Sequence, residues 1–183
     1  MVSQLKVNEI IKQSGSSITI GESGDTITLP STSTLTNFPE NTPAFFAKLS
    51  GNQTVSDNTQ TLVNFDTEVY DTDGQYDTSN KRFVAPSAGK YVFTATAGFS
   101  NFNEPTGTRV HLQFYKNGSL EDFSGDMATV TNNSSADPTI NFTSQLSLTT
   151  DDYVDVRVYQ NGGSDETLQS AYARFFGYRL IGV

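Results

Sequence analysis

The stretch from Phe65 to Phe93 limits the possible folds of this 183-residue chain more than any other segment. At its end, aromatic or small apolar residues alternate with polar or β-branched ones between Lys90 and Ala97. This period of two predicts a strand with one face in a core. The preceding residues 84–89 predict a turn, because Pro86 fixes φ and Gly89 is free to adopt positive φ.

Composition agrees with a β-rich core and excludes several functions. Thirteen Phe and eight Tyr, with no Trp, favour strands over helices. A net charge of -9 argues against nucleic-acid binding and against docking on an anionic membrane. The absence of cysteine rules out disulfides, thiolate catalysis and Cys-ligated metals. No segment has the pattern of a signal peptide or a membrane span, so we expect a chain made in a cytosol that does not leave it by a cleaved signal.

Turn signals at regular intervals predict about ten short strands and no long helix, which means an all-β sandwich or jelly roll. Asn117-Gly118 is the strongest of these signals, since both residues tolerate the positive φ of a two-residue hairpin. Besides 90–97, the expected strands are 44–49, 61–65, 109–116, 120–123, 127–131, 140–148, 154–158 and 171–181. Polar loops that lack obvious core residues are expected to form a variable contact surface: 100–108, 132–138 and 161–168.

Residues 16–42 contain three short β units separated by turns at eight- and nine-residue intervals. Their apolar residues are Ile18, Ile20, Ile27, Leu29 and Leu35. So thin a chain cannot bury these side chains alone, and the units are expected to wind with copies of themselves into a three-chain stem. The alternative is a flexible Ser/Thr/Gly linker.

Residues 1–15 form a separate, short segment whose apolar positions fit a strand and a helix equally well. These positions are Leu5, Val7, Ile10 and Ile11. Such a segment is too short to be stable alone and is expected to dock on another structure.

No catalytic site assembles from the sequence. The one histidine, His111, lies on the face of its strand opposite the apolar residues, and no Gly-x-Ser-x-Gly motif is present. Adjacent acids such as Asp151-Asp152 point to opposite faces of a strand and favour a solvated turn. Asp71 and Asp73 are weak calcium candidates, because the spacing of a complete calcium loop is missing and an ordinary turn explains them.

Seven positions between Phe65 and Phe93 match a family signature in residue type and spacing. They are Phe65, Asp71, Tyr76, Phe83, Gly89, Tyr91 and Phe93. The pattern resembles that of the globular head of complement component one, subcomponent q, and residues 175–181 resemble that family's closing strand. Ala95 departs from it, since the family has an aromatic residue there. The resemblance covers residues 43–183 and implies a ten-stranded, homotrimeric jelly roll of the tumour necrosis factor type.

The resemblance also implies where some aromatic residues and ligands would lie. Trimers of this family pack Tyr and Phe around their axis, so aromatic residues outside the core are expected mostly at subunit interfaces. The candidates are Tyr115, Phe123, Tyr153, Tyr159, Tyr172 and Tyr178. Some family members bind calcium near the axis, which keeps Asp71 and Asp73 as candidates; no other cofactor is expected.

The segment before the head has no Gly-x-y repeat and is similar to stems of bacteriophage tail or head fibres. The resulting hypothesis is a non-enzymatic homotrimeric fibre on a virion surface, made in bacterial host cytoplasm. Residues 1–15 would attach to other virion proteins, 16–42 would form the stem, and 43–183 would present loops to a host-surface glycan or protein. The alternatives are a capsid decoration protein and a soluble bacterial carbohydrate-binding module, with a hydrolase ranked last.

Overall fold

The alternating residues 90–97 form β7 (Gly89–Gly98) in the computed structural model of the chain. Tyr91, Phe93 and Ala95 are fully buried, whereas Val92 and Thr94 on the opposite side keep partial exposure. The period of two therefore separates a core face from an outer face, as predicted.

The structure describes residues 42–100, 102, 107–129 and 138–181, together with 10, 20, 23–26 and 28; for 122–129 it describes the main chain alone. The chain divides into two units, Met1–Phe38 and Pro39–Val183. Because most of residues 1–41 lie outside the described part, the three-segment organisation and the stem stay predictions. In the described residues, no helix is long and apolar enough to cross a membrane.

One sheet has five strands in the order β10–β7–β13–β1–β4, and all its pairs are antiparallel. Its other strands are β1 (Ala44–Lys48), β4 (Thr67–Asp71), β10 (Thr139–Leu148) and β13 (Arg174–Arg179). The last strand of the chain therefore lies in the middle of this sheet, between β7 and β1.

The second sheet has six strands in the order β5–β6–β11–β8–β9, with β3 paired to β11. Its strands are β3 (Thr61–Leu62), β5 (Tyr76–Asp77), β6 (Arg82–Val84), β8 (Arg109–Lys116), β9 (Ser119–Thr129) and β11 (Tyr153–Gln160). β2 (Gln53–Val55) and β12 (Glu166–Leu168) form a small separate pair, and a 3-10 turn (Ser170–Tyr172) precedes β13.

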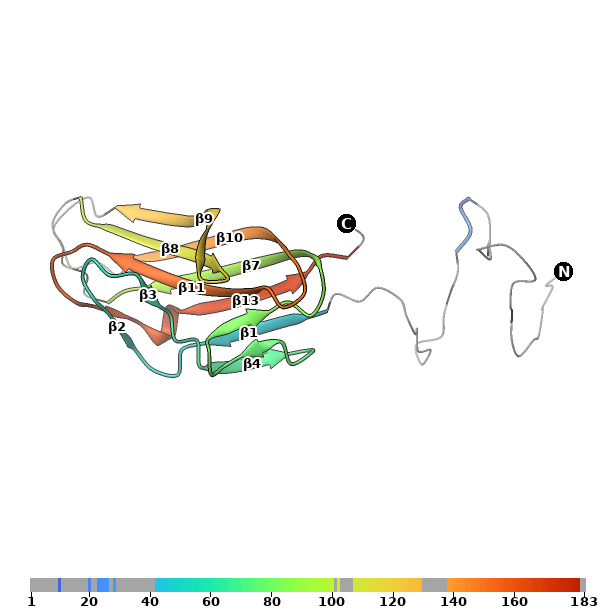
Figure 1. Cartoon of the computed structure of the whole chain (residues 1–183), viewed down its shortest axis with the longest axis horizontal. Coiled ribbons are helices and arrows are strands. Elements are labelled where there is room, and N and C mark those ends of the chain that lie inside the picture. Colours follow the sequence, from blue (N-terminus) through green and yellow to red (C-terminus); the bar gives the residue numbers. More distant parts are fainter. Residues whose placement is uncertain are drawn as a thin grey trace. The chain divides into compact units, whose positions relative to one another are not determined.

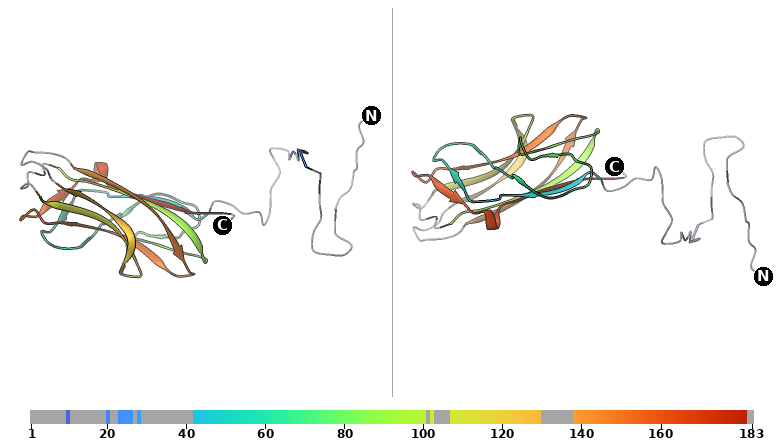
Figure 2. Two further views of the ribbon diagram at one scale, coloured as in Figure 1. Left: turned by 90° about the horizontal axis from the view of Figure 1, so that it is seen from above. Right: turned by 90° about the horizontal axis from the view of Figure 1, so that it is seen from below.

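The two large sheets lie face to face and enclose an aromatic core (Figures 1 and 2). Phe175 lies at its centre, with ring centroids 4.9 Å from Phe45 and 5.7 Å from Phe65. Eight of the described strands have five residues or more, as in a jelly roll, and the other five have two or three. The predicted jelly-roll sandwich is confirmed, although the expected ten strands are eight long and five short ones.

Ala95 replaces the aromatic residue of the family signature without leaving the core underfilled. Its neighbours in register are Phe175 on β13 and Phe142 on β10. Both phenylalanine rings also contact the ring of Phe114, at 6.0 and 5.4 Å. Two large side chains in the flanking strands thus compensate for one small residue.

Three details of the predicted strands and loops are wrong. Residues 61–65 pair as a strand only at Thr61–Leu62, after which Val63 and Phe65 enter the core from irregular backbone. Residues 120–123 and 127–131 belong to one strand, β9, which reaches Thr129. The loops expected to lack core residues contain Phe102 and Leu168, both fully buried, because Phe102 packs on the ring of Phe99 and Leu168 belongs to β12, which pairs with β2.

Gly177→Ala tests how closely β13 approaches its neighbours. A Cβ at Gly177 would lie 2.6 Å from Phe93 Cδ1 and 2.7 Å from the carbonyl oxygen of Val92. We expect a loss of about 1–3 kcal/mol in the free energy of unfolding, measured with urea, because the core cannot accept the methyl group without moving. Gly51→Ala is the control, since a Cβ there meets no atom within 4 Å, and its effect should stay within about 0.5 kcal/mol. Equal effects of the two substitutions would contradict the close approach.

Candidate functional site

The signature residues hold the connection between β4 and β6 against the core. Phe65, Phe83, Tyr91 and Phe93 are fully buried. Tyr76 is nearly so, and its hydroxyl donates to the carbonyl oxygen of Phe65 at 2.8 Å. Burial raises the pKa of Tyr76 far above its usual value, so this phenol stays protonated and donates. These residues act as structural supports for the head.

Asp71 organises the turn that follows β4. Its Oδ2 accepts the main-chain N–H of Tyr76 at 2.6 Å, and its Oδ1 accepts that of Asp73 at 3.2 Å. The carboxylate thus fixes a turn that has Gly74 at φ 67°. The described residues contain no group of three acidic or histidine side chains placed to hold a metal, and calcium binding by Asp71 and Asp73 stays a prediction.

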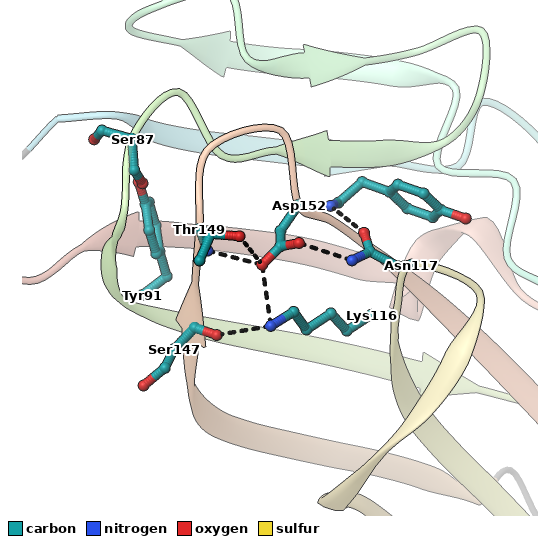
Figure 3. Close-up of polar contacts among 8 residues, drawn as sticks. Ser87, Tyr91, Lys116, Asn117, Ser147, Thr149 and Asp152 are labelled. Carbon is teal, nitrogen blue, oxygen red and sulfur yellow. Dashed lines mark hydrogen bonds and ion pairs between the residues drawn. The ribbon is translucent and has the colours of Figure 1, made fainter.

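A polar cluster fastens the base of the sandwich, the end where β1 begins and β13 ends (Figure 3). Asp152 is its centre and accepts four hydrogen bonds: from the Thr149 main chain at 2.7 Å and hydroxyl at 3.0 Å, from Asn117 Nδ2 at 2.7 Å and from Lys116 Nζ at 3.0 Å. The Asn117 Oδ1 in turn accepts the Tyr153 N–H at 3.0 Å. One carboxylate therefore ties the β8–β9 hairpin to the β10–β11 turn.

The predicted hairpin at Asn117-Gly118 is confirmed within this cluster. Both residues have positive φ, 51° and 78°, as a tight two-residue turn requires. A third turn joins the base, because Ala85 exchanges main-chain hydrogen bonds with Asp151 and Asp152 at 2.9 and 2.8 Å. Tyr91 closes that turn by donating its hydroxyl to the carbonyl oxygen of Ser87 at 2.7 Å (Figure 3).

Hydrogen bonding to the ionised form lowers the pKa of three carboxyl groups in the head. The Thr149 main-chain N–H, followed by the Asn117 amide, holds the pKa of Asp152 far below its usual value. The side chains of Ser50 and Asn80 lower the pKa of Asp66 and Asp77, respectively. All three groups are therefore charged near neutral pH.

His111 has the contacts of a packed side chain. Its ring meets the ring of Tyr159 edge to face, with centroids 5.5 Å apart. Burial, then the nearby Arg109, lowers the pKa of His111, which is therefore neutral at pH 7. No hydrogen bond in the described residues joins it to a serine or a carboxylate, so nothing there forms a nucleophilic triad.

The outer face of the five-stranded sheet carries a row of aromatic side chains. Phe46 of β1 stands directly opposite Phe176 of β13 and Tyr70 of β4 in register. Its ring lies 5.9 and 6.2 Å from theirs, in both cases edge to face. Tyr70 is 48% exposed, and Thr94 continues the row on β7. This is an apolar patch on a sheet face, the type of surface through which proteins associate.

The tyrosines that were expected at subunit interfaces lie on both sheets of the sandwich. Tyr178 shares the outer face of the five-stranded sheet with Phe176, but Tyr115, Tyr153 and Tyr159 lie on the outer face of the other sheet, on β8 and β11. Sequence alone does not tell which sheet receives a strand, and the location of these tyrosines at subunit interfaces stays a prediction. The Phe123 side chain lies outside the described residues, and Tyr172 is 47% exposed next to β13.

The predicted stem and attachment residues lie mostly outside the described residues. Ile10 and Ile20 are described, and they are 59% and 63% exposed in the single chain. The others are Leu5, Val7, Ile11, Ile18, Ile27, Leu29 and Leu35.

Comparison with known proteins connects this head to one family. A family model described as "C1q domain" matches residues 44–180. The uncharacterized protein YqcC of Bacillus subtilis (strain 168) is 30% identical over 115 residues, which make up 61% of this chain. Those residues cover only 30% of that protein, so the chain spans less than a third of its relative.

Two solved structures share the fold at low identity. The globular domain of zebrafish complement 1qA protein matches with a TM-score of 0.54 and 19% identity, over 75% of this chain and 97% of that one. Murine APRIL at pH 5.0 matches with a TM-score of 0.55 and 12% identity, over 75% and 98% of the two chains.

Asp152→Asn tests the cluster at the base. We expect a loss of about 1–3 kcal/mol in the free energy of unfolding at pH 7, because an amide cannot replace a carboxylate that accepts four hydrogen bonds. Asp151→Asn is the matched control: it removes the same charge from the next residue, whose φ of 67° asparagine tolerates.

The same pair of variants predicts a pH dependence. A carboxyl group whose pKa is lowered in the folded state contributes stability above its unfolded pKa, 3.8 for Asp152, and this contribution is lost as the pH falls through the folded pKa. We therefore expect the free energy of unfolding, measured with urea, to fall less between pH 7 and pH 3 for Asp152→Asn than for the parent chain or for Asp151→Asn. Equal losses in all three proteins would show that Asp152 does not carry the effect.

Proposed function

Since this chain belongs to the C1q domain family, we propose that it is a non-enzymatic, homotrimeric virion fibre whose jelly-roll head binds the surface of a bacterial host. The observation that carries the proposal is the aromatic row on the outer face of the five-stranded sheet, Tyr70, Phe46 and Phe176. Three heads packed through this face would bury the row around a common axis. In a closed cyclic assembly every copy uses the same surface, so each chain would need an apolar patch of this kind.

The pattern of apolar residues in the expected stem, residues 16–42, is the argument for a trimer in the form of a fibre. Apolar residues recur at eight- and nine-residue intervals from Ile18 to Leu35, and three parallel chains would bury what one chain exposes. Residues 1–15 would then attach the fibre to other virion proteins, which places the protein on the virion surface after synthesis in the host cytoplasm. Several heads on one particle would convert weak contacts with a host-surface glycan or protein into firm attachment.

A second candidate is a carbohydrate-binding module of a bacterium, and the relative from Bacillus subtilis favours it. A capsid decoration protein with the same head is a variant of the first candidate. These candidate functions share the trimeric head and differ in the structure to which the N-terminal segment would bind.

Phe176→Asp tests the trimer. Light scattering should give the parent chain a mass of about 60 kDa, three times the 19.9 kDa of one chain. The variant should run as a folded monomer, because three carboxylates cannot be buried together at an apolar axis. Leu120→Asp is the control: Leu120 is 47% exposed like Tyr70 but lies on the other sheet, and this variant should stay trimeric. A monomeric parent chain, or a trimeric Phe176→Asp variant, would refute the assembly.

Removal of residues 1–42 tests the interlocked stem. If the three stems are wound together, the truncated chain should unfold at a lower temperature than the full chain at equal concentration, because the stem links the three heads. Scanning calorimetry measures the difference. Unchanged thermal unfolding would mean that these residues are a tether, without affecting the trimeric head.

A further inference from the structure

The outer face of the six-stranded sheet concentrates the chain's arginines. Of the five arginines in the sequence, Arg82, Arg109 and Arg157 occupy outward positions of β6, β8 and β11. The other two, Arg174 and Arg179, donate to main-chain carbonyl oxygens at the ends of the five-stranded sheet. Arginine side chains that contact rings and carboxylates are thus gathered on one face.

Two of these guanidinium groups lie over tyrosine rings. Arg82 is 4.3 Å from the ring centroid of Tyr153, and Arg157 is 4.2 Å from that of Tyr115. Between them stands Asp155, opposite Arg82 on one side and Tyr115 on the other in register. Arg157 Nε and Nη2 donate to the Asp155 carboxylate at 2.9 and 3.4 Å. Arg157 is therefore held in a fixed orientation between the ring of Tyr115 and the carboxylate of Asp155.

The cations of this face remain accessible although its central anion does not. The Asp155 side chain is 7% exposed, against 28% for Arg157 and 33% for Arg82. Arg82 Nε lies 3.9 Å from Asp77 and makes no hydrogen bond. Three arginines face two aspartates at the outward positions of β5, β6, β8 and β11, in a chain with a net charge of -9. Over these four strands the arginines exceed the aspartates by one, so the outward positions carry a net positive charge, opposite in sign to that of the whole chain, although the Asp77 side chain is 31% exposed.

From this arrangement we propose that the outer face of β6, β11 and β8 binds an acidic saccharide. The inference rests on the proposed host-binding function; it names the ligand class and places the contact on a sheet face instead of the loops. Oriented guanidinium forks fit a carboxylate, sulfate or phosphate group, and the tyrosine rings offer flat apolar surface to a sugar ring.

The position of the face agrees with a polymeric ligand and with the trimer. Arg109 and Tyr115 point outward from the same strand, six residues apart, and are separated by about 20 Å. His111 and Gln113 lie between them, and Gln113 accepts a hydrogen bond from Gln60 at 2.7 Å. The aromatic row is on the other sheet of the sandwich, so association through that row leaves this face open to ligand.

The experiment measures retention of the full chain on immobilised polygalacturonate, with dextran sulfate and neutral dextran as parallel surfaces. The parent chain should bind at least one acidic polymer, ignore neutral dextran, and bind less as salt screens the charges. Which acidic polymer it prefers distinguishes a carboxylate-bearing from a sulfate-bearing ligand.

Arg82→Lys and Arg109→Gln are the informative variants. The first keeps the charge but loses the fork and the ring stacking, and the second removes an exposed charge; each should weaken binding by about tenfold. Arg157 is left unchanged, because its replacement would leave the buried Asp155 carboxylate without its positively charged partner. Lys90→Gln is the matched control: it removes one exposed positive charge from the five-stranded sheet, and binding should stay within about twofold.

No binding to either acidic polymer, or equal weakening by Lys90→Gln, would overturn the proposal. Light scattering on the same samples separates this failure from that of the proposed function. A trimer that adsorbs to host cells but ignores both acidic polymers would retain the fibre function and refute the acidic-saccharide face.

Discussion

The packing of the last strand between two earlier ones is the constraint on which the head depends. β13 lies between β7 and β1, so the five-stranded sheet is complete only when residues 174–179 have been added. Phe175 then fills the centre of the core, while Gly177 lets the strand approach Phe93 without a clash. An inward aromatic residue and a missing side chain, two positions apart, together close the sandwich.

The base of the sandwich is held in a different way. There the chain has three tight turns, and their polar groups are satisfied by one another, with Asp152 as the common acceptor. A carboxylate with four hydrogen-bond donors is a strong, directional link between these turns. It lies at the end of the sandwich where β1 begins and β13 ends.

The two outer faces of the sandwich differ in chemistry and therefore in the partners they suit. Apolar rings such as Phe46 and Phe176 pack edge to face on one sheet, which favours association between copies. On the other sheet the guanidinium groups of Arg82 and Arg157 lie over tyrosine rings, which favours a polar, anionic ligand. A trimer that buries the first face and displays the second three times would use both, and would gain from multivalent binding.

By itself, the sequence determined the features that depend on local periodicity: the strand at 90–97, the Asn117-Gly118 hairpin, and the all-β class with its spaced aromatic signature. Only the tertiary structure decided which sheet each strand joins. Tyr115 and Tyr178 have similar sequence surroundings, yet they lie on opposite outer faces, and Phe102 is buried in a segment that looks polar. The physical reason is the separation in sequence of the residues involved. Alternation is set by the backbone of a single strand, whereas Arg82 and Tyr153 become neighbours only when β6 pairs with β11, a strand that comes much later in the chain.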